Sequence, residues 1–289
     1  IKLDKIRTFA SNDYDYIFCE DLQLLPLAVK LKKSSKLFFD AREIYTEQDS
    51  KSLFFRIFEK RERDRLLKKY LPKCDVRLTV NEKIKEFYEK QYNSNFEVIL
   101  SAPIRSIHNS PLKTSGEIKL VHHGLANKNR HIENMILACN SLEDHYSADF
   151  YLSGSEKHID FLKKFIDSEK VRILPPVDFK VIPEMLSQYD VGIYLLKPEN
   201  MNLNYSLPNK FFEFINSGLA VCTGPSPVMS RIINEQKIGF VSESFSSNSF
   251  RNALEKFSQE KIEKFKKNSR IAAEKYNWEN QEKILSDLL

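Results

Sequence analysis

Short apolar runs alternate with longer charged stretches along most of the chain. Each run is bounded by polar residues, as is typical of strands buried in parallel sheets. Helical patterns lie between the runs, including those at 132–139, 157–166 and 182–189. This alternation predicts right-handed βαβ units and an α/β fold. The predicted strands are 16–19, 36–39, 76–80, 96–100, 118–122, 149–152, 171–174, 191–195, 220–223 and 239–241.

One stretch interrupts the alternation and suggests a domain boundary. Residues 103–117 contain two prolines, three serines and Gly116, a composition typical of a linker. A chain of 289 residues is long for one hydrophobic core and ordinary for two. We therefore expect an N-terminal domain over 1–105, a linker over 106–117, a C-terminal domain over 118–270 and a closing helical segment over 271–289.

Composition narrows the class of protein. No apolar run approaches the roughly 20 residues that span a bilayer, and the first residues lack the apolar segment of a signal peptide. The net charge of +5 is modest, and no nucleic-acid-binding motif accompanies it, so nucleic acid is a poor candidate partner. Cys19, Cys74, Cys139 and Cys222 lack metal-ligand spacing. Buried free thiols in a reducing cytoplasm explain them best.

The segment 206–224 is the most informative part of the chain. Pro208 suits a first helical turn, Gly218 suits the position just past a helix end, and 219–222 is a short apolar strand. Lys210 lies in the first turn, where the helix dipole disfavours a cation. A cation placed there suggests that an anion binds between it and the helix N-terminus. The alternative is an ordinary αβ unit with a surface lysine.

A second candidate phosphate loop follows the first strand of the C-terminal half. His122, His123 and Gly124 end that strand, and Lys128 and Arg130 follow. Ligands of doubly wound sheets bind at the carboxyl ends of strands, and an arginine fork matches phosphate oxygens. A diphosphate site is expected, with a solvated basic loop as the alternative. A metal site on the histidine pair is the weaker interpretation, because adjacent strand residues point to opposite faces.

Five segments, in order along the chain, resemble the GT-B glycosyltransferases of the large group 1 (family 4-like) class. The last of them carries the Pro-Asn-Lys-x-x-Glu signature of one subgroup, followed by Gly218-Leu-Ala-Val. The resemblance implies two Rossmann-like, doubly wound parallel-sheet domains that face a cleft. It also implies a metal-independent enzyme, retaining the anomeric configuration, which builds a bacterial surface polysaccharide or lipid-linked glycan. The five segments are 14–21, 37–45, 74–81, 120–130 and 208–213.

The same resemblance assigns donor-binding residues. It implies that the nucleoside diphosphate sugar is the donor substrate and that no further cofactor is needed. Glu213 matches the glutamate that holds the ribose, but the second glutamate of the family is replaced by Tyr205. Asn202, Asn204 or Tyr205 itself would then contact the donor sugar. The full set of expected donor-binding residues is Gly124, Lys128, Arg130, Gly154, Val177, Asn209, Lys210 and Glu213.

The N-terminal half is expected to supply the acceptor side. Glu20 and Asp21 follow a strand, at the place where the family often has a histidine, and are the candidate catalytic residues. A carboxylate can serve in acid–base chemistry if its environment adjusts its pKa. Asp40, Arg42 and Glu43 follow the next strand and are the expected acceptor-side residues. Each alone could equally be a helix cap or a surface ion pair. The Asp13-Tyr-Asp15 triplet precedes its strand, so no metal site is expected there.

Residues 51–73 carry nine lysines and arginines against three acidic residues, and begin with Leu53, Phe54, Phe55, Ile57 and Phe58. This predicts a basic amphipathic helix suited to anionic lipid headgroups, which would make the protein peripheral at the inner face of the plasma membrane. A helix packed by its phenylalanines with a solvated basic face is the alternative.

Two other functions remain open at this level. One is a nucleotide-sugar epimerase with the same fold, and the other is a non-catalytic nucleotide-sugar-binding protein. All seven glycines lie at or beyond Gly116 and all six histidines at or beyond His108. By comparison with the family, the first strands of the N-terminal domain are expected to be missing, in either a fragment or a reduced domain.

Overall fold

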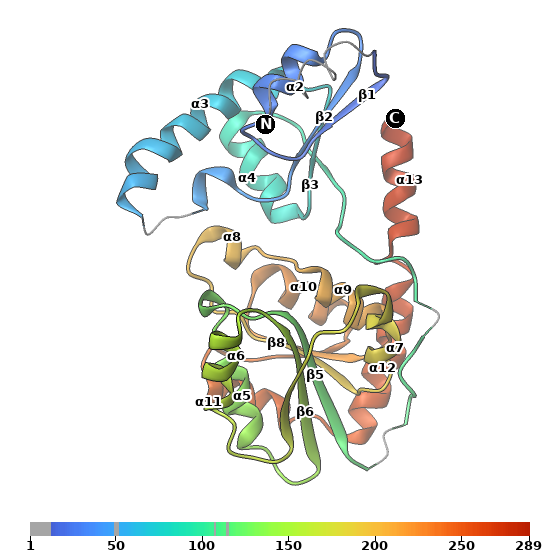
Figure 1. The fold of residues 1–289 in the computed structure, drawn as a ribbon. Helices are drawn as coiled ribbons and strands as arrows, with labels where there is room; N and C mark the ends of the chain where they lie inside the picture. Colours follow the sequence, from blue (N-terminus) through green and yellow to red (C-terminus); the bar gives the residue numbers. More distant parts are fainter. Residues whose placement is uncertain (1–12, 49–51, 107, 114–115) are drawn as a thin grey trace. The chain divides into compact units, whose positions relative to one another are not determined.

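A computed structural model describes residues 13–48, 52–106, 108–113 and 116–289. Residues 1–10, whose sequence has a helix-like pattern, lie outside the described residues. The chain divides into two compact units (Figure 1). Unit 1 contains the described residues up to Leu100, together with Glu199–Tyr205 and Ile284–Leu289. Unit 2 contains Ser101–Pro198 and Ser206–Lys283.

Unit 1 is built on a four-stranded parallel sheet whose strands follow chain order, β1-β2-β3-β4. Phe39, Leu67 and Tyr88, from a strand and two helices, are fully buried in one hydrophobic core. The elements are β1 (Tyr16–Cys19), α2 (Leu25–Leu31), β2 (Lys36–Ala41), η1 (Tyr45–Glu47), the π-helical turn η2 (Phe55–Glu59), α3 (Lys60–Tyr70), η3 (Leu71–Lys73), β3 (Val76–Thr79), α4 (Glu82–Tyr92), β4 (Glu97–Val98) and α8 (Met201–Asn204).

Unit 2 is built on a six-stranded parallel sheet in the order β10-β9-β8-β5-β6-β7. Its strands are β5 (Ile118–Leu125), β6 (Tyr146–Ser153), β7 (Val171–Leu174), β8 (Val191–Tyr194), β9 (Ala220–Thr223) and β10 (Gly239–Val241). Its helices are η4 (Lys128–Arg130), α5 (Glu133–Asn140), α6 (Glu156–Lys163), η5 (Phe179–Val181), α7 (Ile182–Leu186), α9 (Asn209–Asn216), α10 (Pro227–Gln236), α11 (Ser247–Leu254), α12 (Gln259–Ala273) and α13 (Trp278–Leu288), whose last turns belong to unit 1.

The prediction of an α/β fold with two parallel sheets is confirmed, and every predicted strand is present. The differences are at strand ends. β5 and β6 are longer than their apolar runs because they pair from Ile118–Tyr146 to Leu125–Ser153. β4 keeps only two residues. Ladder hydrogen bonds to a neighbouring strand, which apolar patterning does not record, set these limits.

The state of the cysteines and the character of the helices agree with what the composition predicted. All four cysteines are buried and free, as predicted. Burial raises the pKa of the Cys139 and Cys222 thiols, so they are protonated and unreactive. Across the described ranges, no helix combines the length and the apolar character needed to cross a membrane.

Part of the predicted linker is packed against unit 2 through a buried lysine. The Lys266 Nζ donates to the Pro111 carbonyl oxygen at 2.8 Å and lies 2.5 Å from Asp190 Oδ1. Asp190 Oδ2 accepts from the Lys119 N–H at 2.9 Å. The Lys266 side chain is fully buried, and burial lowers its pKa while Asp190 opposes that change. The ion pair between Lys266 and Asp190 therefore joins α12 to the residue before β8. The hydrogen bonds of the same two side chains add the segment before β5 and the start of β5.

Breaking this pair should destabilise unit 2. Lys266→Met leaves the Asp190 carboxylate buried without its cation, and removing one partner of a buried ion pair costs about 3–5 kcal/mol. Urea denaturation followed by circular dichroism would measure the loss. Lys267→Met, which removes an exposed lysine from the same helix, is the control. Equal stability of the two variants would contradict a structural role for the pair. Asp190→Asn combined with Lys266→Met should recover part of the loss.

Candidate functional site

The strand order of unit 2 reverses beside β5. The chain adds β6 and β7 on one side of β5, then returns to place β8, β9 and β10 on the other. In open parallel sheets such a reversal separates the loops at the carboxyl ends of the two adjacent strands, and ligands bind in the crevice between them. The loops after β5 and β8 are therefore where a ligand of unit 2 is expected.

Two glycines let the backbone of this edge pack closely. Gly124, near the end of β5, has φ +128°, and an added Cβ would lie 2.6 Å from Lys210 Nζ. Gly154, directly after β6, has φ +156°, and an added Cβ would lie 2.7 Å from the Ala126 carbonyl oxygen. Both backbone conformations are ones that other residues rarely adopt. The two predicted glycines thus keep the edge open and bring Lys210 over the end of β5.

Lys210 is the most unusual residue of the site. It lies in the first turn of α9, is only 7% exposed, and its Nζ has no hydrogen-bond partner among the described residues. The ammonium lies 5.2 Å from the centre of the Tyr194 ring. Burial, together with the positive charge of Arg130, lowers the pKa of Lys210 to about 7, and Glu213 opposes this effect. A buried ammonium without an acceptor is unfavourable, so the arrangement would be stabilised by an anion.

The other two predicted phosphate-binding cations, Arg130 and Lys128, lie at different places. Arg130, in η4, acts on both Lys210 and Tyr194 through its charge, so it belongs to the same edge. Lys128, in the same turn, lines a different cavity of about 490 Å³ between the starts of α5 and α6. Asn209 is exposed at the start of α9, and Val177 is half-buried in the loop after β7. Pro208 adopts an extended conformation just before α9, one position earlier than the first turn in which it was expected.

Glu213 lies one turn along α9 from Lys210 and faces a histidine. Its Oε2 is 3.1 Å from His123 Nε2, and neither atom has a well-aligned hydrogen bond in the described structure. The neighbouring His122 is directed elsewhere: its Nδ1 donates to the Ile193 carbonyl at 2.9 Å. Burial and Lys210 hold the pKa of His122 well below its usual range, so that ring is neutral. The sequence singled out His123 only as half of a metal pair, and its contact with Glu213 depends on tertiary structure.

In unit 1 the predicted acidic residues meet at one arginine. Arg42 Nη2 lies 2.8 Å from Glu20 Oε1, and Arg42 Nε lies 2.8 Å from Asp40 Oδ2. Strands β1 and β2 pair in parallel up to Cys19 and Phe39, so Glu20, just after β1, lies beside Asp40, which is inside β2 and not after it as predicted. Burial raises the pKa of Asp40, although Arg42 opposes the increase. These residues were predicted individually, and the ion-pair arrangement follows from the register of the two strands.

The same cluster borders a polar pocket of about 170 Å³. Asp21 closes a local turn, since its Oδ1 accepts from the Gln23 N–H at 2.6 Å. Glu43 is bonded to the Gln48 amide. The sequence analysis missed Tyr45, whose hydroxyl donates to the Glu20 carbonyl oxygen at 3.0 Å. The lining residues are Glu20, Asp21, Leu22, Gln23, Arg42, Glu43, Tyr45, Gln48 and Arg63.

Residues 199–205 pack within unit 1, and this changes the interpretation of Asn202. Its Oδ1 accepts from the Ile44 N–H at 2.6 Å and its Nδ2 donates to the Ile44 carbonyl at 3.0 Å. The Asn81 amide donates to the Tyr205 carbonyl at 2.9 Å, and the Tyr205 ring packs on the core of unit 1. The Asn202 side chain is therefore engaged in holding this segment, so it is a poor candidate for a donor-sugar contact.

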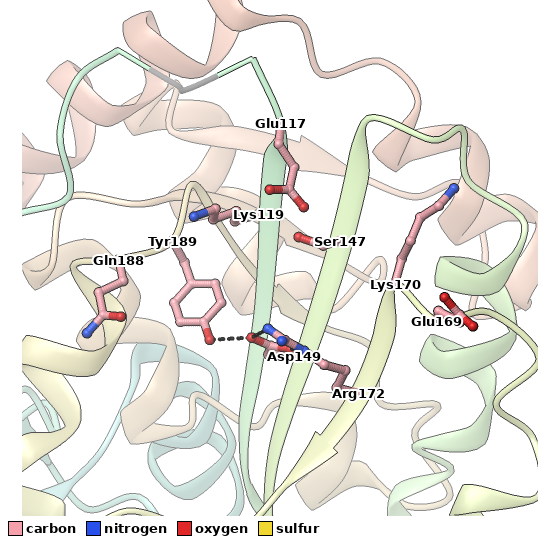
Figure 2. A pocket seen from close by; sticks show the side chains of 9 residues that line it. All are labelled: Glu117, Lys119, Ser147, Asp149, Glu169, Lys170, Arg172, Gln188 and Tyr189. Carbon is pink, nitrogen blue, oxygen red and sulfur yellow. Dashed lines mark hydrogen bonds and ion pairs between the residues drawn. The ribbon is translucent and has the colours of Figure 1, made fainter.

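A polar pocket of about 500 Å³ lies at the amino-terminal part of the unit 2 sheet (Figure 2). Arg172 binds Asp149 through both of its forked nitrogens, at 2.7 and 2.8 Å, and the Tyr189 hydroxyl donates to Asp149 at 2.6 Å (Figure 2). These groups satisfy one another, unlike Lys210. The pocket is therefore assigned a structural role. Among the described residues, no three His, Cys, Asp or Glu side chains form a group that could hold a metal.

No protein-family model matches the chain, and no curated protein is significantly similar to it in sequence. Similarity to solved structures is extensive. Sucrose-phosphate synthase from Thermosynechococcus elongatus superposes with a TM-score of 0.77 at 13% identity, covering 98% of this chain and 74% of that one. Anabaena HepE, solved with UDP and glucose, has a TM-score of 0.75 at 12% identity and coverage of 99% and 80%.

A third similar structure is the pneumococcal O-GlcNAc transferase GtfA, solved with UDP and GlcNAc. Its TM-score is 0.74 at 13% identity, and the match covers 99% of this chain but 58% of that one. At such identities the likeness shows the fold. The chain has the GT-B fold, with two parallel-sheet units.

Proposed function

We propose that the chain is a glycosyltransferase that transfers a sugar from a nucleoside diphosphate sugar to a glycan or lipid-linked acceptor. The observation that carries the proposal is the buried, unpartnered ammonium of Lys210, held over Gly124 and near the charge of Arg130. Two cations in a poorly solvated site repel each other, and a diphosphate would stabilise both. The fold supports the proposal, since the similar HepE and GtfA were solved with UDP.

The donor would bind along the carboxyl edge of the unit 2 sheet. Its diphosphate would lie between Lys210 and Arg130 and accept hydrogen bonds from the first N–H groups of α9, beside Asn209. Gly124 and Gly154 leave the backbone close to the ligand. Glu213 would accept hydrogen bonds from the ribose hydroxyls, with His123 keeping its carboxylate in place. The nucleobase would meet the loop that contains Val177. Lys128 would contribute only long-range charge.

Transfer in this proposal needs no metal. The bond between the anomeric carbon and the phosphate oxygen breaks, and Lys210 and Arg130 stabilise the negative charge on the leaving diphosphate. The acceptor hydroxyl oxygen bonds to the same carbon from the same face, and its proton passes to a leaving-phosphate oxygen. This path retains the anomeric configuration. Glu20 would stabilise the positive charge that develops on the sugar, with Asp21 beside it, and Asp40, Arg42 and Glu43 would bind the acceptor.

The biological setting is proposed on the sequence motifs. They resemble those of enzymes that build bacterial surface polysaccharides from cytoplasmic nucleotide sugars, so we place the reaction in the cytoplasm. A lipid-linked acceptor would bring the enzyme to the inner face of the plasma membrane.

One observation favours a second function, a nucleotide-sugar-binding protein without catalysis. The Glu20 carboxylate, the candidate catalytic group, is already paired with Arg42. A chain that binds the donor but neither transfers nor hydrolyses the sugar, with any acceptor mixture, would support this function over the transferase.

Thermal unfolding in the presence of UDP-, GDP-, dTDP- and CMP-sugars tests donor binding directly. A ligand at about 100 times its Kd adds roughly 2.7 kcal/mol to the stability of the native state that binds it. At least one diphosphate sugar should stabilise the chain. A CMP-sugar, which has one phosphate, should not match it. Stabilisation by none of the diphosphate sugars would contradict the proposed function.

Lys210→Met should weaken binding of the stabilising donor by about 10- to 100-fold, because a hydrogen bond to a charged group contributes about 1.5–3 kcal/mol. The free variant should at the same time be more stable than the parent, since a buried unpartnered ammonium is removed. Calorimetric titration and urea denaturation measure the two effects. Lys128→Met, at the separate cavity, is the control, and it should strongly change neither the donor affinity nor the stability of the free chain. A Lys210→Met variant that is less stable and binds normally would assign the lysine a structural role.

Donor affinity should fall as pH rises above 7. The free pKa of Lys210 is about 7, and a bound diphosphate raises it because the ligand favours the ammonium. Affinity is therefore greatest below pH 7 and declines by up to tenfold per pH unit above it. The phosphates of a nucleotide sugar do not titrate in this range. The charged and titratable neighbours of Lys210 include Arg130, Glu213, the neutral His122 and Tyr194, whose pKa is raised by burial.

Calorimetry at pH 8 in buffers of different ionisation enthalpy should detect proton uptake on binding. Lys210→Met should bind with little pH dependence and without proton uptake. Proton uptake that persists in this variant would assign the titration to another group.

Glu20→Gln should lower sugar transfer by about 100-fold or more, the usual scale of a missing acid–base or charge-stabilising group. Donor affinity should stay nearly unchanged, since the residues assigned to the donor belong to unit 2. Turnover and binding would be measured separately, with the exposed Glu82→Gln on α4 as the control and Asp21→Asn as a test of the second candidate catalytic residue. Normal turnover by Glu20→Gln would remove Glu20 from the mechanism.

A further inference from the structure

The helix that opens with Leu53 exposes an apolar patch on unit 1. Leu53, Phe54, Ile57 and Phe58 are 68%, 62%, 42% and 61% exposed. The Phe54 and Phe58 rings contact each other, with centroids 5.2 Å apart. Isolated exposed apolar residues are ordinary, but four within six residues form a contiguous patch that water solvates poorly. The sequence left open whether these phenylalanines pack the helix inward, and only Phe55 does so, at 3% exposure.

A basic stripe continues from this patch along α3, the helix labelled in Figure 1. Arg61, Arg65, Lys68 and Lys69 follow Phe58 at spacings that keep them on one helical face, and all are exposed. The opposite face packs on unit 1 through Phe55 and Leu67. The exposed face of this helix is therefore apolar at its start and cationic over the rest of its length, while its other face is buried.

Acidic partners neutralise only part of the stripe. Lys68 pairs with Asp64 at 2.7 Å, and Arg65 lies 3.9 Å from Glu62. No carboxylate in the described parts of the chain forms an ion pair with Arg61 or Lys69. A net positive surface beside exposed Leu, Ile and Phe side chains matches an anionic bilayer, in which the apolar groups enter the acyl boundary and the cations meet the headgroups.

The composition of the patch favours lipid over other partners. Single-stranded nucleic acid is bound by flat aromatic platforms, whereas here aliphatic Leu53 and Ile57 lie beside the two phenylalanine rings. A second copy of the chain would present the same positive charge, which opposes self-association through this face.

We propose that the helix from Leu53 to Tyr70 binds unit 1 to anionic membrane surfaces, with Phe54 and Phe58 inserted and Arg61 and Lys69 at the phosphate level. This surface belongs to unit 1 and does not depend on the donor site. The proposal therefore remains testable whether or not the chain transfers sugar.

Co-sedimentation of the whole chain with vesicles tests this. Vesicles containing 30% phosphatidylglycerol in phosphatidylcholine should bind the chain, and pure phosphatidylcholine vesicles should bind it at least tenfold more weakly. Binding to the anionic vesicles should decrease between 0.1 and 0.5 M salt. Equal binding to both kinds of vesicle, or to neither, would overturn the proposal.

Variants locate the contact. Phe54→Ser with Phe58→Ser should reduce vesicle binding at least tenfold, while the matched pair Phe161→Ser with Phe179→Ser, also exposed but in unit 2, should not. Arg61→Gln with Lys69→Gln should lose about fivefold per charge, whereas Lys83→Gln with Lys90→Gln on α4 should lose little. Unchanged circular dichroism would exclude unfolding.

Two outcomes would show that the apolar patch binds something other than a membrane. A concentration-dependent dimer that Phe54→Ser and Phe58→Ser dissociate, seen in analytical ultracentrifugation without vesicles, would assign the patch to a second copy. Binding of single-stranded oligonucleotide lost in the same variant would assign it to nucleic acid. Either result would overturn the proposal.

Discussion

The parallel pairing of β5 with β6 on one side and β8 on the other is the constraint on which the candidate site depends. Because the chain reverses its order of strand addition at β5, the segments after β5 and β8 diverge and leave an edge that no further strand covers. Gly124 ends β5 at this edge, and α9, which carries Lys210 and Glu213, follows β8 and leads into β9. Gly124 is therefore brought close to Lys210 and Glu213 by the order of the strands in the sheet, although these residues are far apart in the chain.

Both units pair the polar groups discussed above, with Lys210 as the exception. In unit 1, Glu20, Asp40 and Arg42 compensate one another, and Asn202 satisfies the backbone of Ile44. In unit 2, Asp149 and Asp190 are likewise paired. Lys210 differs from these paired groups, since its ammonium is buried and has no acceptor. A fold that pairs its other buried charges in this unit and leaves this ammonium unpaired has a free-energy cost that a ligand can remove.

Burial therefore has opposite meanings for two lysines of unit 2. Lys266 is fully buried and bonded to Asp190 and to a carbonyl, so it fastens α12 to the sheet. Lys210 is nearly as buried, but its Nζ has no acceptor and lies beside Gly124 and over the Tyr194 ring. A lysine's ordinary preference is for solvent, and the difference between these two lies entirely in their acceptors. The same reasoning separates the Asp149 pocket, whose groups are satisfied, from the edge at Gly124.

The sequence by itself determined the alternation of strands and helices, the two parallel sheets and the presence of a helix start at Lys210, because apolar periodicity, glycine and proline act locally. It also singled out Glu20, Asp40 and Arg42 as residues at the ends of neighbouring strands. Only the tertiary structure decided that Arg42 joins the two carboxylates, that His123 faces Glu213 while His122 faces away, and that Lys128 lies apart from Arg130. It likewise decided that Asn202 holds a segment of unit 1 and that Phe54 and Phe58 remain exposed while Phe55 is buried. These outcomes depend on strand register and on which helix covers which face, and both arise from contacts between residues far apart in the chain.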